Sequence, residues 1–256
     1  MIHSTAIVSP KAIIAENVEV GPYSIIGDDV EVGSGTRLAS HVVINGPTKI
    51  GENNRVFQFA SIGDEPQDKK YRGEPTRLEI GNGNTIREYV TINRGTTQDD
   101  GLTSIGDNNW LMAYVHIAHD CKVGNETIFA NCGSLAGHCI VEDYVIFGGM
   151  SGAHQFTRIG AHSFIGNNTS ITRDVPPYVL VSGHPAVPKG INSEGLKRRG
   201  FDADQVRVIK KAFRLLYRSD LRLEEARERI NELAEDHQVL ESMRTFLALS
   251  TRSIVR

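Results

Sequence analysis

The sequence has no long apolar run, no strong excess of one charge and only three cysteines. The missing apolar run argues against a membrane-spanning helix, and the N-terminus lacks the charged head and apolar stretch of a secretory signal. A formal net charge of −3 provides no basic field for nucleic acid. Cys121, Cys132 and Cys139 include no CxxC pair, so we expect reduced thiols in a cytoplasmic protein, packed as small core residues.

An aliphatic residue returns at almost every sixth position from Ile2 to Ile171. Strand side chains alternate between faces every two residues, so this period indicates about four strand residues and a turn. A helical period of about 3.6 residues does not fit. So regular a repeat predicts a stacked solenoid over most of the chain. The main members of the series are Ile2, Val8, Ile14, Val20, Ile26, Val32, Leu38, Ile44, Ile50, Val56, Ile62, Ile80, Ile86, Ile92, Ile105, Leu111, Ile117, Val123, Phe129, Leu135, Val141, Phe147, Ala153, Ile159, Ile165 and Ile171.

Two other positions of the repeat have a restricted composition. The residue after the aliphatic one is often glycine, which suits a corner that needs positive φ or a close backbone approach. The residue four places after it is mostly Ala, Ser or Thr, which fits a narrow interior beside one large aliphatic side chain.

The repeat is interrupted twice. Residues 64–79 are rich in charge and proline, and we expect an exposed loop there. The distance in sequence from Ile62 to Ile80 would equal one whole coil. Residues 97–104 form a second insertion, which shifts the phase by one.

After Ile171 the sequence becomes turn-rich and then helical, with Asp202 as a plausible N-cap. We therefore expect a solenoid over residues 1–186 and a small helical domain over 187–256 that covers the solenoid end.

The six-residue pattern resembles the hexapeptide repeat of left-handed parallel β-helix acyltransferases. This resemblance implies a left-handed coil with three faces and about 18 residues per turn, so that residues 18 apart are vertical neighbours about 4.8 Å apart. Five polar side chains and a glycine amide then gather on one corner. The columns are His119–Gly137–Gln155, Asp120–His138–Phe156 and Ala118–Ala136–His154.

The cluster has the groups that acyl transfer needs. A histidine is the natural general base near neutral pH, and Asp120 could orient it if a turn brings the two together. The amide of Gly137, one coil above His119, could donate to a developing oxyanion. Any one of these histidines alone is better read as a solvated corner residue, whereas the clustering favours a functional site.

We expect no metal site. Such a site needs three converging ligands, and the His-x4-His pair common in β-helical zinc carbonic anhydrases is absent. His116 and His119 are the only weak candidate pair in this segment.

Several motifs make the resemblance more specific. Over its whole length the chain resembles the UDP-N-acetylglucosamine O-acyltransferase family of lipid A biosynthesis. The matching segments are residues 57–63 (FQFASIG), 67–71 (QDKKY), 73–77 (GEPTR), 86–88 (IRE), 93–96 (NRGT), 116–121 (HIAHDC), 135–138 (LAGH), 154–156 (HQF), 174–178 (DVPPY) and 194–201 (EGLKRRGF).

The resemblance implies a cofactor-free homotrimer with sites between subunits. The family transfers an (R)-3-hydroxyacyl chain from acyl carrier protein to the 3-hydroxyl of UDP-N-acetylglucosamine. It implies that His119 is the general base, that Asp120 assists it and that the Gly137 amide holds the oxyanion. The implied substrate-binding residues are Asp68, Lys70, His116, His138, His154 and Gln155, with Asn192, Glu194 and Arg198 near the nucleotide. Lys70 could equally be an ordinary loop lysine, and Arg198 part of a solvated helix face.

Two positions carry information about this member of the family. Asn93 stands where the family often has histidine before Arg-Gly-Thr, so that histidine's role does not carry over. Asn167 stands where the family lines its acyl groove, and we hypothesise that it shortens the accepted chain. Residues 197–218 hold eight basic side chains and two acidic ones, which suits an acidic carrier protein as well as a solvated helix face.

Three alternatives follow from the same repeat. One is another hexapeptide acyltransferase, which the motifs within 64–79 and 192–201 argue against. The second is a zinc lyase of the carbonic anhydrase type. The third is a non-catalytic solenoid, but such proteins use flat ladders of one residue type, whereas this chain gathers varied polar groups at one corner.

Overall fold

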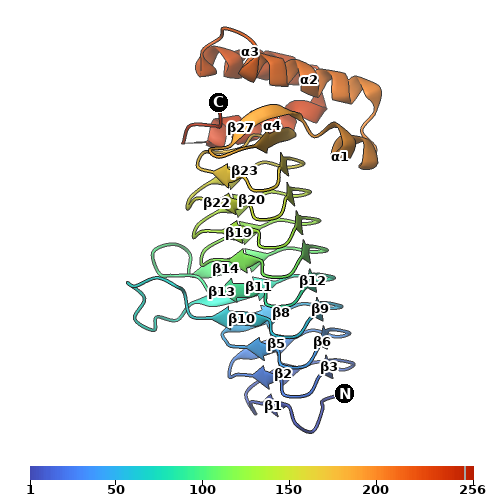
Figure 1. The fold of residues 1–256 in the computed structure, drawn as a ribbon, viewed down its shortest axis with the longest axis vertical. Coiled ribbons are helices and arrows are strands. Elements are labelled where there is room, and N and C mark those ends of the chain that lie inside the picture. Colours follow the sequence, from blue (N-terminus) through green and yellow to red (C-terminus); the bar gives the residue numbers. More distant parts are fainter. Residues whose placement is uncertain (251) are drawn as a thin grey trace.

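Three parallel sheets run the length of the molecule, and each coil of the chain contributes one strand to each sheet (Figure 1). The computed structural model describes residues 1–250 and 252–256. Its fold is the predicted left-handed parallel β-helix followed by a small helical domain.

The strands are short and follow one another in a fixed order around the coil. The first sheet contains β1 (Ile7–Val8), β4 (Ile25–Ile26), β7 (Val43–Ile44), β10 (Ser61–Asp64), β13 (Thr91–Asn93), β16 (His116–Ile117), β19 (Ser134–Leu135), β22 (Gly152–Ala153) and β25 (Ser170–Ile171). The second contains β2 (Ile13–Ile14), β5 (Val30–Val32), β8 (Thr48–Ile50), β11 (Arg77–Ile80), β14 (Leu102–Ile105), β17 (Lys122–Val123), β20 (Ile140–Val141) and β23 (Arg158–Ile159). The third contains β3 (Glu19–Val20), β6 (Arg37–Leu38), β9 (Arg55–Val56), β12 (Thr85–Ile86), β15 (Trp110–Leu111), β18 (Ile128–Phe129), β21 (Ile146–Phe147), β24 (Phe164–Ile165), β26 (Val179–Ser182) and the antiparallel β27 (Val187–Ile191).

The aliphatic series fills the interior, as predicted. Ile44, Ile62 and Ile92 are fully buried, and small residues such as Ser24 and Thr36 are buried beside the column. Ile62 pairs with Ile92, whereas Ile80 lies on the second sheet. The interpretation of the interval from Ile62 to Ile80 as one whole coil was therefore wrong, because the insertion lengthens a single corner.

The glycines suggested that the residue directly after the aliphatic one has positive φ, but the structure has positive φ mainly at another position of the repeat. The third residue after the aliphatic one has positive φ, for example Asn17, Tyr23 and His41. The glycine directly after the aliphatic one is needed for close approach instead, since a Cβ on Gly21 would lie 2.6 Å from the carbonyl carbon of Ala39.

We call the turns after the first, second and third sheets the first, second and third corners. Both insertions leave from the first corner, because they connect β10 to β11 and β13 to β14. They project together on the left of Figure 1. Since β11 begins at Arg77 and β14 at Leu102, the last residues of the intervals 64–79 and 97–104 belong to strands.

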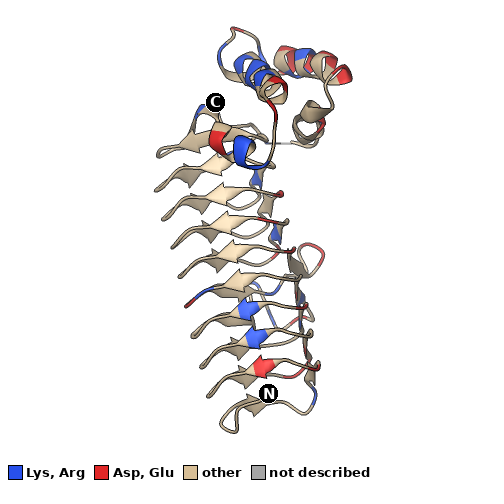
Figure 2. Ribbon diagram, turned by 90° about the vertical axis from the view of Figure 1, so that its right-hand side faces the viewer, with Lys and Arg blue, Asp and Glu red and all other residues tan. Residues whose placement is uncertain are grey.

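Charge is distributed unevenly over the outer faces. On the third sheet, seen in Figure 2, the parallel strands carry charged residues only near the N-terminal end, at Glu19, Arg37 and Arg55, and the antiparallel β27 adds Lys189 at the other end. The strands of the first sheet carry no Lys, Arg or Glu, and their only acid is Asp64 at the end of β10. No helix among residues 1–250 and 252–256 is both long and apolar enough to cross a membrane.

The helical elements cover the C-terminal end of the solenoid (Figure 1). They are α1 (Ser193–Arg198), α2 (Ala203–Tyr217), α3 (Leu223–Glu235), η1 (Gln238–Leu240) and α4 (Glu241–Leu249). Asp202 caps α2 as predicted and forms a capping box with Gln205. The hydroxyl of Tyr178 donates to the carbonyl of Val239 and joins the helices to the last coil. The division at residues 186 and 187 stays a prediction, since β27 continues the third sheet beyond it.

The three cysteines are free thiols, and two of them are core residues as predicted. Cys121 and Cys139 are buried, whereas Cys132 is exposed. Its exposure follows from its place on the third corner, where it takes the outward-facing position with φ of 61°.

Candidate active site

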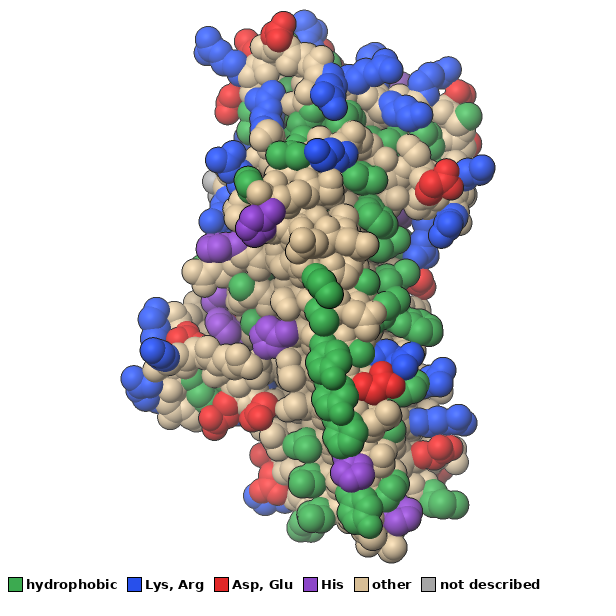
Figure 3. Space-filling model, in the orientation of Figure 1, with side chains coloured by type: hydrophobic (Ala, Val, Ile, Leu, Met, Phe, Trp, Pro, Cys, Tyr) green, Lys and Arg blue, Asp and Glu red, His purple; other side chains and the backbone are tan. Residues whose placement is uncertain are grey.

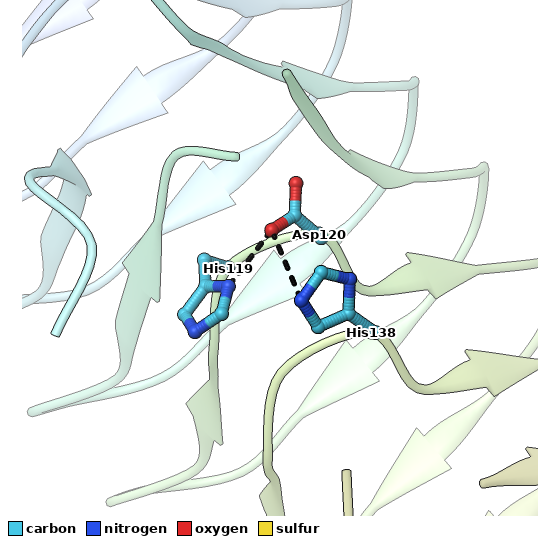
Figure 4. Close-up of side chains that lie close together, drawn as sticks. All are labelled: His119, Asp120 and His138. Carbon is cyan, nitrogen blue, oxygen red and sulfur yellow. Dashed lines mark hydrogen bonds and ion pairs between the residues drawn. The ribbon is translucent and has the colours of Figure 1, made fainter. Parts of the chain in front are cut away.

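The first corner joins His119 and Asp120 into a hydrogen-bonded pair. Both follow β16, and Asp120 has φ of 60°, so the backbone turns between them. The Asp120 carboxylate thereby comes back to the neighbouring imidazole, with 2.8 Å between His119 Nδ1 and Asp120 Oδ2 (Figure 4). This is the turn on which the predicted partnership depended.

The Asp120 carboxylate is buried and densely hydrogen-bonded. Thr96 donates its amide to Oδ1 at 2.8 Å and its hydroxyl to Oδ2 at 2.6 Å. Burial alone raises the pKa of the Asp120 carboxyl, but the hydrogen bonds from His119 and Thr96 outweigh it and hold the pKa below its usual value. An ionised carboxylate only accepts, so His119 Nδ1 must donate the hydrogen, and in the neutral ring Nε2 is then the nitrogen that can act as a base.

His138 lies one coil above and faces two carboxylates. Its Nδ1 is 3.2 Å from Asp99 Oδ2, and its Nε2 is 3.6 Å from Asp120 Oδ2. The ring meets His119 edge to face at a centroid distance of 5.2 Å and stacks on Phe156 at 4.4 Å. The ring of His138 is therefore fixed from both sides beside the pair.

Gly137 packs directly against the imidazole of His119. A Cβ at this position would lie 2.6 Å from Cε1 and 2.8 Å from Nε2 of that ring. Among the hydrogen bonds of the described residues, none uses the Gly137 amide as donor, so it is available to a ligand. Only glycine leaves the imidazole room in its present place.

The two loops of the first corner form a wall beside the pair. The side chain of Gln98 donates to Asp68 Oδ2 at 2.8 Å, and Lys70 donates its amide to Asp68 Oδ1 at 2.9 Å. The backbone hydrogen bond from Lys70 and the bond from Gln98 lower the pKa of the Asp68 carboxyl, with a smaller contribution from the charge of His119. At the loop base, the side-chain nitrogen Nδ2 of Asn93 donates to the backbone carbonyl of Glu65 at 2.7 Å. Asp68 and Lys70 thus lie on the same side as His119.

The other predicted histidines differ in their surroundings. His116 is on β16, where its Nδ1 is 2.7 Å from the Thr91 hydroxyl. Burial, and then the charge of His119, lower the pKa of His116. His154 and Gln155 form the exposed turn one coil above Gly137, with His154 Nδ1 3.1 Å from the Gln155 carbonyl.

A groove of about 360 Å³ leads from His154 across the upper first sheet toward Met150 and Asn168 on the third corner. Asn167 lies next to Asn168 and accepts a hydrogen bond from the Gly149 amide at 3.1 Å. A larger groove of about 560 Å³, along the second sheet near Lys49 and Asn125, contains none of the predicted site residues.

Asn192, Glu194 and Arg198 lie on a different corner. Asn192 caps α1 and donates to the carbonyl of His162 at 3.0 Å. His162 follows β23, so this attachment is on the second corner, while the His119 pair is on the first. Within one chain the structure does not bring these three residues to the His119 pair.

Sequence reasoning missed Thr96, Gln98 and Asp99, which hold Asp120, Asp68 and His138. The sequence indicated only their neighbourhood, because the insertion at residues 97–104, which Thr96 directly precedes, leaves from the same corner as His119. The structure also brings three potential metal ligands together, since one nitrogen or oxygen from each of His119, Asp120 and His138 lies within 4.8 Å of the others. The expectation of no metal site considered only pairs along the sequence.

Known proteins similar to this chain agree with the fold and the motifs. The family model described as UDP-N-acetylglucosamine O-acyltransferase, domain 2, matches residues 174–255, and the bacterial transferase hexapeptide model matches 2–46 and 102–133. Acyl-[acyl-carrier-protein]–UDP-N-acetylglucosamine O-acyltransferases of Verminephrobacter eiseniae and Herminiimonas arsenicoxydans are 58% and 54% identical to it, over 100% of this chain and 99% of each relative.

Solved structures show the same similarity. The UDP-N-acetylglucosamine acyltransferase of Francisella novicida has a TM-score of 0.99 at 45% identity, over 100% of this chain and 94% of that one. The UDP-N-acetylglucosamine O-acyltransferase of Moraxella catarrhalis has a TM-score of 0.97 at 46% identity, over 100% and 99%.

Proposed function

Because the chain belongs to the UDP-N-acetylglucosamine O-acyltransferase family, we propose that it transfers an acyl chain from acyl carrier protein to UDP-N-acetylglucosamine. The acyl group is an (R)-3-hydroxyacyl chain, the acceptor is the 3-hydroxyl of the sugar, and the reaction is the first step of lipid A biosynthesis. The observation that supports this chemistry best is the His119–Asp120 pair, with a free Nε2 beside the Gly137 amide.

The geometry suggests how the reaction proceeds. His119 Nε2 takes the proton of the sugar hydroxyl as that oxygen attacks the thioester carbonyl carbon. Asp120 stabilises the imidazolium that forms, and the Gly137 amide donates to the oxyanion of the tetrahedral intermediate. The C–S bond then breaks, and the imidazolium returns its proton to the leaving thiolate. Each of these groups lies on the rigid first corner.

The remaining predicted residues surround this reaction centre. Lys70 and Asp68 extend from the loop wall, and His116, His138, His154 and Gln155 line the first sheet and its corner. The groove from His154 toward Asn168 is a suitable path for the acyl chain, and Asn167 beside it is our candidate for limiting chain length.

A homotrimer would complete the site. Asn192, Glu194 and Arg198 lie on the second corner, so a neighbouring copy would have to bring them to His119. The first sheet, whose strands carry Asp64 as their only acid and no Lys or Arg, lies between the catalytic corner and a row of stacked aromatic rings on the third corner, visible as a largely green stripe in Figure 3. The row consists of Tyr23, His41, Phe59, Tyr89 and Tyr114, with centroid distances of 4.8–5.2 Å. Exposed apolar stripes of this kind are typical of subunit interfaces.

The helical domain offers a surface for the acidic carrier protein. Lys189, Lys210, Arg214 and Arg218 line a cavity of about 350 Å³ between β27 and α2. Positive charge on such a surface steers an acidic partner. It raises the association rate more than it changes the dissociation rate. We expect the enzyme to work in the cytoplasm, where its three free thiols stay reduced.

An acyl-transfer assay tests the proposal. The donor is 3-hydroxyacyl carrier protein, the acceptor is UDP-N-acetylglucosamine, and wild type is compared with His119→Ala. Loss of the base should lower kcat by about 10²–10⁴-fold. His3→Ala, an exposed histidine at the far end of the solenoid, is the matched control. Wild-type turnover in His119→Ala would overturn the assignment of the base.

A further inference from the structure

We propose that His119, Asp120 and His138 also form a binding site for a divalent transition-metal ion, with Zn²⁺ as the preferred ion, and that the bound ion inhibits the enzyme. The binding rests on the geometry of the three side chains. The inhibition rests on the function proposed above, in which His119 must accept a proton.

The three ligand atoms are already close to a metal-binding arrangement. They are His119 Nδ1, Asp120 Oδ2 and His138 Nε2. Asp120 Oδ2 is 2.8 Å from His119 Nδ1 and 3.6 Å from His138 Nε2, and all three atoms lie within 4.8 Å of one another. In a tetrahedral zinc site with bonds of about 2.0–2.1 Å, ligand atoms lie about 3.3 Å apart. The two contact distances therefore need to change by about 0.5 and 0.3 Å, and the third separation, which is at most 4.8 Å, by no more than about 1.5 Å, through rotation of the side chains.

The atoms behind the ligands hold them in the orientation that a metal requires. His138 Nδ1 lies 3.2 Å from the Asp99 carboxylate, which accepts its hydrogen in the neutral tautomer and leaves the lone pair of Nε2 directed toward Asp120. Metal-binding histidines usually have a carboxylate on the second nitrogen in this way. Thr96 holds the other carboxylate oxygen of Asp120 through its amide.

Two acceptors face each other at the centre of the cluster. In the neutral tautomer of His138 that donates from Nδ1 to Asp99, the Nε2 lone pair and the Asp120 carboxylate are 3.6 Å apart with no hydrogen between them. A cation at this point attracts both. Asp120 is only 1% exposed, so water screens that attraction weakly.

The donor set selects the class of ion. Two imidazole nitrogens and one carboxylate oxygen favour Zn²⁺, Co²⁺ or Ni²⁺, while Mg²⁺ and Ca²⁺ prefer oxygen ligands alone. Three protein ligands leave a fourth position for water, as in open zinc sites.

Metal binding would remove the base without removing a side chain. An ion on His119 Nδ1 takes the place of the hydrogen there, and that proton moves through solvent to Nε2. The ring stays neutral, but Nε2 now carries a hydrogen and cannot accept one from the sugar hydroxyl. Zinc should therefore lower kcat, and Mg²⁺ at the same concentration should not.

The test measures binding without substrate on the full-length protein. Co²⁺ is titrated and followed by the visible absorption of a low-symmetry site, and the Zn²⁺ affinity is obtained by competition with a chelating dye. Wild type is expected to bind one ion per chain. His138→Ala should lose at least 10²-fold in affinity, and Asp99→Asn, which changes only the supporting carboxylate, should lose about 10–100-fold. His3→Ala is the control and should bind as wild type does.

Each result has a defined meaning. No Co²⁺ spectrum in wild type, or equal affinity in wild type, His138→Ala and Asp99→Asn, overturns the site. Asp99→Asn changes a partly exposed loop side chain, so it keeps the test decisive if His138→Ala does not fold. Metal binding that depends on His138 in a protein without acyl-transfer activity supports the site and contradicts only the proposed function. Full turnover by an enzyme with zinc bound at His138 overturns the inhibition.

Discussion

Replacing Gly137 by alanine tests whether the position of the His119 imidazole controls catalysis. The new methyl group would lie 2.6 Å from Cε1 and 2.8 Å from Nε2, whereas carbon atoms in contact lie about 3.5–4.0 Å apart. The ring must therefore move by about 1 Å, and its 2.8 Å hydrogen bond to Asp120 would be strained or lost. A misplacement of about 1 Å commonly costs about 10²-fold in rate.

The fold should tolerate this change. Gly137 does not have positive φ, so alanine can adopt its backbone conformation, and overpacking costs about 1–3 kcal/mol. We expect kcat for acyl transfer to fall about 10²-fold in a protein that still unfolds cooperatively on heating. Gly27→Ala, on the same corner far below the site, is the matched control, because a Cβ there has no heavy atom closer than 3.4 Å.

A double mutant separates displacement of the ring from other effects. If Gly137→Ala acts by moving the imidazole, it should lower the rate little further once His119 is alanine. A folded Gly137→Ala enzyme with wild-type kcat would refute the reasoning. So would full additivity of the two changes, since the methyl group would then act on something other than the ring.

Four further outcomes are expected. Asn167→Gly should shift preference toward longer carrier-linked 3-hydroxyacyl chains in competition assays, and an unchanged preference would contradict its role. Tyr89→Glu should lower the sedimentation mass from trimer toward monomer by placing charge in the aromatic row. Arg214→Glu should raise KM for the carrier protein at low salt and have little effect at high salt, whereas a salt-independent effect would exclude steering. Burial, and then the charge of Arg199, lower the pKa of His162 from 6.5 to about 4. Between these two pH values the unfolded chain binds a proton at His162 that the folded protein does not bind. Stability should fall as pH drops from about 6.5 toward 4, by about 1–2 kcal/mol after allowance for partial solvent exposure, and His162→Gln should lose this dependence in urea titrations.

The repeat made the interior and the vertical columns predictable. A period of six fixes which side chain points inward, and a spacing of 18 fixes which side chains are stacked, so His119 and Gly137 could be placed together before any coordinates. The number of faces and the hand of the coil came from the resemblance, because a period alone does not choose between them. The position with positive φ was less predictable, since Tyr23, His41 and Cys132 occupy it without a common residue type.

The contacts made by the insertions could not be predicted. Thr96 is the last repeat residue before the insertion and Asp99 lies within it, and no column arithmetic applies to a loop. Their contacts with Asp120 and His138 depend on how the loop returns to the corner. The placement of Asn192 could not be predicted either, because it depends on how α1 packs against the column of Tyr144 and His162, where Arg199 covers the Tyr144 ring at 4.4 Å.

The repeat and its insertions make different contributions to the site. Neighbouring coils are stacked about 4.8 Å apart. This spacing brings Gly137 next to the base, but it is longer than a hydrogen bond between two side chains. The shorter distances come from elsewhere: the positive φ of Asp120 turns its carboxylate back to His119, and Thr96 reaches in from the loop at 2.6 Å. The corner alone thus turns Asp120 toward His119, and the insertion adds the contacts that hold Asp120 and His138. The insertions leave from the same corner as the histidine columns, and Thr96, at the start of the second one, reaches the buried carboxylate from there.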